Sequence, residues 1–158
     1  MQTGMLIDVY GVLVDASGTS LIDSAVAVLR RMRLAQVPVG VVGHGRLDAT
    51  ALADLLEPTG ENVSAARLET SASTATRLPS AALLQLIAQL QMDPVTSWFI
   101  TAEPANLQAA ASAGIGAAVL LGDREPDAGL LLRVERARDL ADAPRVMIPA
   151  QGGCWHEH

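Results

Sequence analysis

Residues 6–15 read LIDVYGVLVD: a short apolar run ends in Asp8, and a turn that contains Gly11 follows it. The run is continuously apolar rather than alternating, which is typical of a strand buried on both faces in a parallel sheet. In α/β folds, ligands bind at the edge of the sheet where the parallel strands end. Asp8 is therefore the first candidate functional residue.

Similar apolar runs alternate with helical patterns along the rest of the chain. The spacing predicts strands over 5–9, 37–43, 97–101, 116–122 and 145–149, with a further candidate strand over 66–70. Amphipathic helices are predicted over 20–36, 47–60, 79–93, 104–114 and 130–143. This alternation predicts an α/β fold, a doubly wound Rossmann-like parallel sheet with helices on both faces. We assign 1–149 to this domain and 150–158 to a C-terminal tail.

Composition limits the partners of the chain. It has 158 residues with a formal net charge of −6, and all of its basic residues are arginine. The acidic balance argues against nucleic acid and anionic membrane surfaces as partners. No apolar run reaches the roughly 18 residues of a membrane span. No secretory leader is visible, and a single cysteine excludes an internal disulfide framework, so we expect a cytoplasmic protein.

The order of motifs resembles the haloacid dehalogenase (HAD) superfamily. The first motif of that family is a strand ending in Asp, any residue, Asp, Gly, and DVYGVLVD (8–15) matches it with Tyr10 in place of the second acid. VPVGVVGHG (37–45) stands where the family has a strand ending in Ser or Thr. SWFITAEPANLQAAASAGIGAAVLL (97–121) resembles the segment that carries the last acidic motif. The resemblance spans about residues 5–122 and implies a HAD-like core.

The resemblance also implies residue roles near the first strand. In the family the first Asp attacks the substrate to form a covalent ester, the second acid is general acid and base, and a lysine balances charge. Asp8 keeps the nucleophile position, whereas Tyr10 takes the acid/base position. Leu78 stands at the lysine position, with Arg77 beside it as a candidate ligand-binding residue. His44 follows the second strand and is a candidate to assist Asp8.

The later motifs lack the polar and acidic side chains that the family has at these positions. Gly43 occupies the Ser/Thr position, which leaves only backbone N–H groups to receive a phosphate. In the last motif Thr101 and Ala102 replace Gly-Asp, and Asn106 replaces the final acid. Family members use these two acids, with the nucleophile, to hold Mg²⁺. Glu103 is the only acid nearby, and it is a candidate either for ligand binding, as are Gly43 and Thr101, or for capping the following helix.

Two hypotheses about function remain open. In the first, the chain is a non-catalytic pseudo-hydrolase with a binding, regulatory or scaffold role, and needs no cofactor. Its partner is then another protein or a second copy of the chain, with a small phosphorylated molecule as a candidate ligand, and Asp8 persists to accept loop N–H bonds. In the second, an atypical hydrolase uses Asp8 as nucleophile, assisted by Tyr10 or His44, and requires Mg²⁺.

Tyr10 also resembles the dehalogenase branch of the family, which has Tyr at that position. That branch needs no Mg²⁺. That branch carries a helical cap domain, and the stretch from Asp15 to Ser20 is too short for one. We therefore expect a HAD-like core with no cap domain, and dehalogenation is the less favoured form of the hydrolase hypothesis.

The tail contains three alternating candidate metal ligands, Cys154, His156 and His158. Thiolate and imidazole groups are ligands for transition metals. Recurrent metal-binding motifs, however, leave two or more residues between neighbouring ligands. We expect no metal site here.

Overall fold

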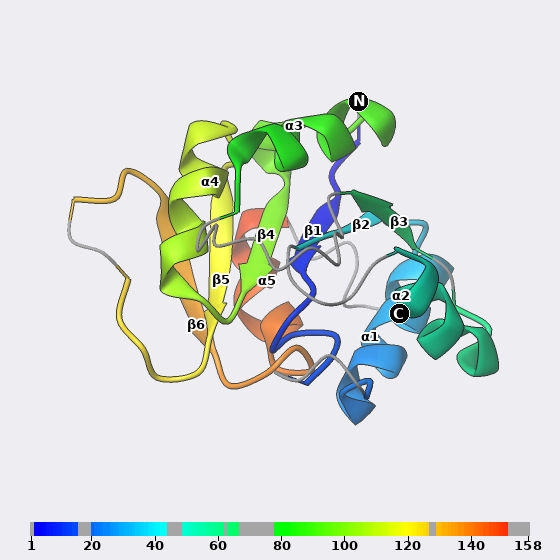
Figure 1. Ribbon diagram of the computed structural model, residues 1–158. Helices are drawn as coiled ribbons and strands as arrows, with labels where there is room; N and C mark the ends of the chain where they lie inside the picture. Colours follow the sequence, from blue (N-terminus) through cyan, green and yellow to red (C-terminus); the bar gives the residue numbers. More distant parts are fainter. Residues whose placement is uncertain are drawn as a thin grey trace.

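The computed structural model describes residues 2–15, 20–43, 49–61, 63–66, 78–126 and 129–151. At its centre lies a six-stranded sheet in the order β3-β2-β1-β4-β5-β6, and every neighbouring pair is parallel (Figure 1). The strands are β1 Met5–Asp8, β2 Val39–Val42, β3 Ser64–Ala66, β4 Trp98–Thr101, β5 Ala117–Leu121 and β6 Arg133–Ala137. The chain runs outward from β1 to β3, then returns to β4 and runs outward to β6, which is the doubly wound layout that the sequence predicts.

Helices cover both faces of this sheet. They are α1 Asp23–Leu34, α2 Ala49–Leu56, α3 Ser80–Gln89, α4 Leu107–Ser112 and α5 Ala143–Gln151, with short 3₁₀ turns at Glu57–Thr59, Pro94–Thr96 and Pro104–Asn106. Met5 and Ile7 of β1 join a buried cluster with α1, α2 and α5, whereas Leu6 joins a second cluster with α3 and α4. Successive side chains of a strand point to opposite faces, so β1 is buried on both. The predicted α/β fold class is confirmed.

Helical spacing accounts for most of the predicted helices. In α1 the buried residues follow the i, i+3, i+4, i+7 pattern of one helix face: Ala25, Val28, Leu29 and Met32. In α3 the buried residues fall into two adjacent pairs one turn apart: Ala82, Leu83, Leu86 and Ile87. Among the described residues, no helix is long and apolar enough to cross a membrane.

The C-terminal part differs from the prediction. We expected a helix over 130–143 and a strand over 145–149, and both assignments are wrong: the structure has β6 at Arg133–Ala137 and α5 at Ala143–Gln151. The segment VERARDLADA is rich in helix-forming residues, but pairing with β5 overrides this preference. Only one edge of β6 is paired with a named strand, and its charged side chains suit an edge strand.

The last helix shows the opposite conflict. RVMIP (145–149) looks like a strand because it is apolar and β-branched, yet Ala143 and Met147 lie one helical turn apart and are both buried in the core. α5 continues through Gln151, past the boundary at 149 that we predicted for the domain. The candidate strand over 66–70 also shifts, because β3 is Ser64–Ala66 and residues 67–70 lie outside the described part.

Candidate functional site

Asp8 ends β1, the strand at which the order of the sheet reverses. Its side chain is buried, with a residue exposure of 4%, and it lies beside Val42 at the end of β2. The chain then turns sharply: Gly11 has φ +77°, and its N–H donates to the carbonyl of Val14 over 2.8 Å. A β-carbon built on Gly11 would lie 3.0 Å from the Cβ of Ala102. The turn therefore packs closely against the segment that follows β4.

Two neutral side chains donate to the same oxygen of Asp8. Thr101 Oγ1, at the end of β4, donates to Asp8 Oδ2 over 2.8 Å. Asn106 Nδ2 donates to Asp8 Oδ2 over 2.7 Å. Thr101 and Asn106 are themselves buried, with exposures of 0% and 6%. Hydrogen bonds to a carboxylate favour its ionised form, so this arrangement suits a negatively charged Asp8.

A third contact fixes which way the Asn106 amide faces. The backbone N–H of Leu78 donates to Asn106 Oδ1 over 3.1 Å. If the amide were flipped, its NH₂ would face the Leu78 N–H and its oxygen would face the Asp8 carboxylate. Asn106 therefore links the segment before α3 to the end of β1 in a way that only an amide can, as donor and acceptor together.

Glu103, a candidate ligand-binding residue, is engaged elsewhere. Its Oε1 accepts the N–H of Ala105 over 3.2 Å, which caps the 3₁₀ turn that precedes α4. Its Oε2 forms an ion pair of 2.7 Å with Arg124 Nη1. Both oxygens of Glu103 thus have partners within the chain. The backbone N–H of Glu103 donates to Thr101 Oγ1 over 3.0 Å, which helps to orient that hydroxyl.

The remaining predicted site residues are only partly placed. Tyr10 is half-buried directly after β1, bridges to Val14 and packs against the core. Gly43 is buried directly after β2, at the same edge of the sheet as Asp8. His44 and Arg77, and the tail ligands Cys154, His156 and His158, lie outside the described residues. The structure therefore brings together Asp8, Thr101 and Gly43 at one edge.

The described residues around Asp8 do not fit Mg²⁺. A hard divalent cation needs several oxygen ligands, usually with more than one carboxylate. Here Oδ2 of Asp8 faces an amide N–H and a hydroxyl proton, and Ala102 supplies only a methyl group. Within the described ranges, no group of three or more His, Cys, Asp and Glu side chains could hold a metal ion.

Sequence reasoning missed the positive role of Asn106. It treated this residue only as a lost metal ligand, whereas the structure shows it completing a buried hydrogen-bond chain from Leu78 to Asp8. The available signal was chemical: replacing Asp by Asn keeps the shape and supplies a donor to a neighbouring carboxylate.

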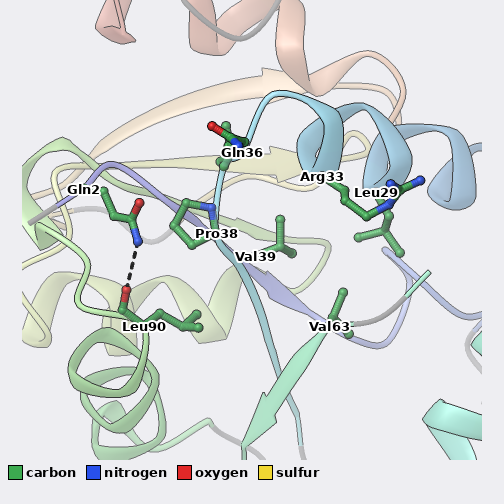
Figure 2. A pocket seen from close by; sticks show the side chains of 9 residues that line it. Gln2, Leu29, Arg33, Gln36, Pro38, Val39, Val63 and Leu90 are labelled. Atoms are coloured by element: carbon green, nitrogen blue, oxygen red, sulfur yellow. Dashed lines mark hydrogen bonds between the residues drawn. The ribbon is translucent and has the colours of Figure 1, made fainter.

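A pocket of 330 Å³ lies at the other end of the strands. It is lined by residues that include Pro38 and Val39 at the start of β2, and Gln2 donates to the carbonyl of Leu90 across it over 3.4 Å (Figure 2). Among the described residues that line it, Arg33 alone carries a guanidinium, and this group is hydrogen-bonded to Glu61. Because it opens at the amino-terminal edge of β2, this pocket is not part of the Asp8 site.

Several solved structures share this fold. A candidate HAD-like phosphatase from Mesorhizobium loti has a TM-score of 0.66 at 18% identity, covering 96% of this chain and 87% of that chain. D,D-heptose 1,7-bisphosphate phosphatase from B. bronchiseptica, complexed with magnesium and phosphate, has a TM-score of 0.69 at 18% identity, covering 94% and 99%. Cobalt-bound deoxy-D-mannose-octulosonate 8-phosphate phosphatase from Haemophilus influenzae has a TM-score of 0.68 at 16% identity, covering 96% and 90%.

No family model matches the sequence, and no curated protein matches it either. At identities of 16–18% the structural similarity shows the fold, and it does so over nearly the whole chain. The chain therefore has a HAD-like fold, as the order of its motifs predicts. Activity and cofactor do not follow from this similarity.

Proposed function

We propose that this chain is a HAD-like protein with a degenerate site, which binds a ligand or partner without Mg²⁺-dependent hydrolysis. The observation that carries the proposal is the Asn106 amide, whose Nδ2 donates to Asp8 Oδ2 over 2.7 Å and whose orientation is fixed by Leu78. Loss of the family's carboxylate at this position does not by itself require a hydrogen-bond donor beside Asp8. Yet a matched hydrogen-bond donor fills the position.

In this proposal Asp8 has a structural role. Its carboxylate joins the end of β1 to Thr101 at the end of β4 and to Asn106 before α4. A carboxylate that accepts two strong hydrogen bonds on one oxygen is stabilised as an anion, which makes that oxygen a weaker nucleophile.

A second candidate function is hydrolysis through Asp8. Fold similarity to enzymes whose names include two sugar phosphate phosphatases favours it, as does the position of Asp8 at the carboxyl end of a central strand. If this alternative holds, Mg²⁺ is the expected cofactor and Asp8 the nucleophile. The cytoplasmic location and a protein or self-association partner also remain parts of our proposal.

Hydrolysis of an activated aryl phosphate decides between the two functions. Wild type and Asp8→Asn would be assayed with p-nitrophenyl phosphate, with and without millimolar Mg²⁺, after circular dichroism has confirmed that both are folded. We expect the two proteins to give the same background rate under both conditions. Mg²⁺-dependent turnover by wild type that disappears in Asp8→Asn would overturn the proposal in favour of the hydrolase.

A further inference from the structure

A second polar groove lies at the carboxyl ends of β5 and β6. Its volume is 510 Å³, and three arginines line it: Arg136 in β6, Arg138 just after β6 and Arg145 in α5. Three carboxylates, those of Asp123, Glu125 and Asp142, line the same groove, so its formal charges balance in a chain whose formal net charge is −6. The same edge of the sheet carries Asp8, three strands away in the order β1-β4-β5-β6.

One carboxylate holds two of these arginine residues in place. Arg145 donates to both oxygens of Asp142, with Nε to Oδ1 at 2.9 Å and Nη2 to Oδ2 at 3.2 Å. The backbone N–H of Arg138 donates to Asp142 Oδ2 over 3.0 Å. These hydrogen bonds hold the pKa of Asp142 well below its usual range, and the bond from Arg145 makes the largest contribution. Asp142 is thus ionised at neutral pH and engaged in positioning the groove.

The groove has more donors than its own acceptors satisfy. Arg136 donates through Nη2 to the carbonyl of Gly122 over 3.0 Å, yet its Nε is buried and has no hydrogen-bond partner in the described part of the chain. The Arg138 guanidinium lies 3.7 Å from Asp142 and is 88% exposed on its side chain. A guanidinium has five N–H donors, and the described acceptors engage only some of those on Arg136, Arg138 and Arg145.

Two further acids line the groove, and both are exposed. Glu125 lies 3.5 Å from Arg136 Nη1, a long contact, with its side chain 85% exposed. Asp123 follows β5 and is also exposed. Exposed ion pairs of this kind contribute little, so an incoming anion could displace Glu125 from Arg136 at low cost.

We propose that this groove binds the phosphate group of a small phosphorylated molecule. Arginine matches phosphate because its planar fork makes paired, charge-assisted hydrogen bonds, and a phosphate offers enough oxygens for several guanidinium groups. Three inter-strand spacings of about 4.8 Å place the groove roughly 14 Å from Asp8, outside the degenerate site. That the bound molecule is not hydrolysed rests on the proposed function. Binding of its phosphate group in the groove does not depend on Asp8.

Isothermal titration of the full chain tests the groove. The probes are inorganic phosphate and glycerol phosphate, with acetate as the control anion, all at constant ionic strength. In Arg138→Gln the exposed guanidinium is removed while the backbone bond to Asp142 remains, so the variant should fold normally. Loss of one hydrogen-bonding charge predicts at least about a tenfold rise in Kd. The matched control is Arg133→Gln, an exposed arginine of β6 that lies over the Trp98 ring and does not line the groove.

The outcomes separate this proposal from that for Asp8. We expect phosphate binding that Arg138→Gln weakens, that Arg133→Gln and Asp8→Asn leave unchanged, and that acetate does not reproduce. Absent binding, equal binding of acetate, or an affinity that depends on Asp8 but not on Arg138 would each overturn it. Hydrolysis of p-nitrophenyl phosphate through Asp8 would overturn the proposed function and leave the groove in place.

Discussion

Asn106 Nδ2 lies 2.7 Å from Asp8 Oδ2, at a place where the HAD resemblance leads us to expect a second carboxylate. The same amide accepts the N–H of Leu78, so it is held from both sides. Restoring the acid would replace an attraction by a repulsion between two buried carboxylates. This pair of residues is therefore the most direct place to test how the site works.

Asn106→Asp should destabilise the protein by about 2–4 kcal/mol at neutral pH, since one buried partner of a charged group is replaced by a like charge. Repulsion raises the pKa of one of the two carboxyl groups, so the loss should be smaller at about pH 4 than at about pH 8. Urea unfolding of wild type and variant at the two pH values measures this loss of unfolding free energy. A loss that does not depend on pH would mean that the two carboxylates do not face each other.

The double variant Ala102→Asp, Asn106→Asp should gain affinity for Mg²⁺. It places three carboxylates near one point, counting Asp8, and a hard cation prefers such oxygen ligands. Thermal unfolding with and without millimolar Mg²⁺ should show a rise in Tm for the variant and none for wild type. If the folded variant responds no more than wild type, the correspondence of these positions with the family motif is wrong.

Thr101→Val should cost about 1–3 kcal/mol of unfolding free energy, because it removes a buried donor to Asp8 and keeps nearly the same shape. Thr101→Ser is the matched control, since it keeps the hydroxyl and loses only a methyl group. Guanidinium unfolding of both variants gives the difference. A loss in Thr101→Ser with none in Thr101→Val would assign the role of Thr101 to its methyl group rather than to its hydrogen bond.

Glu61 should contribute to stability in a pH-dependent way. Its side chain is 2% exposed and bonds to Arg33 and Arg30 of α1, with the nearest contacts at 3.0 and 3.2 Å. The hydrogen bond from Arg33 is the main cause that lowers the pKa of Glu61 in the folded state. The contribution is therefore complete above the unfolded glutamate pKa of about 4.3 and is lost as the pH falls below it.

Glu61→Gln isolates that contribution. The unfolding free energies of wild type and variant should differ most at neutral pH and converge as the pH is lowered below about 4. Urea unfolding across this range provides the measurement, with Glu57→Gln as a control, since Glu57 lies in an exposed position of the same 3₁₀ turn that precedes Glu61. A constant difference at every pH would show that the ion pairs do not carry the effect.

The sequence predicted the interior of the fold well, because the central strands are buried on both faces and their apolar runs have few other interpretations. It failed at β6 and α5, where the local preference of VERARDLADA for a helix opposes the pairing of that segment with β5. That pairing joins distant residues, such as Val134 with Ala118, and a local pattern does not contain it.

At the site, the sequence predicted that Asp8 and Thr101 lie at one edge, since both end parallel strands. It could not predict that Asn106 bonds to Leu78 and Asp8 together, because this depends on where the segment before α3 meets the start of α4. Nor could it predict the groove at Arg138. This groove is formed at the end of β6, and the sequence pattern predicted a helix in that segment.

The position of β1 between β2 and β4 has a consequence for how the chain is made. Met5 pairs with Val39 on one side and with Trp98 on the other, so β1 leaves the ribosome before either partner strand and completes its pairing late. Until β4 has been synthesised, one edge of an apolar strand is open, which is the kind of edge that recruits unwanted partners. Thr101 and Asn106 also arrive at that stage, so the carboxylate of Asp8 gains these two donors only when the two halves of the sheet join.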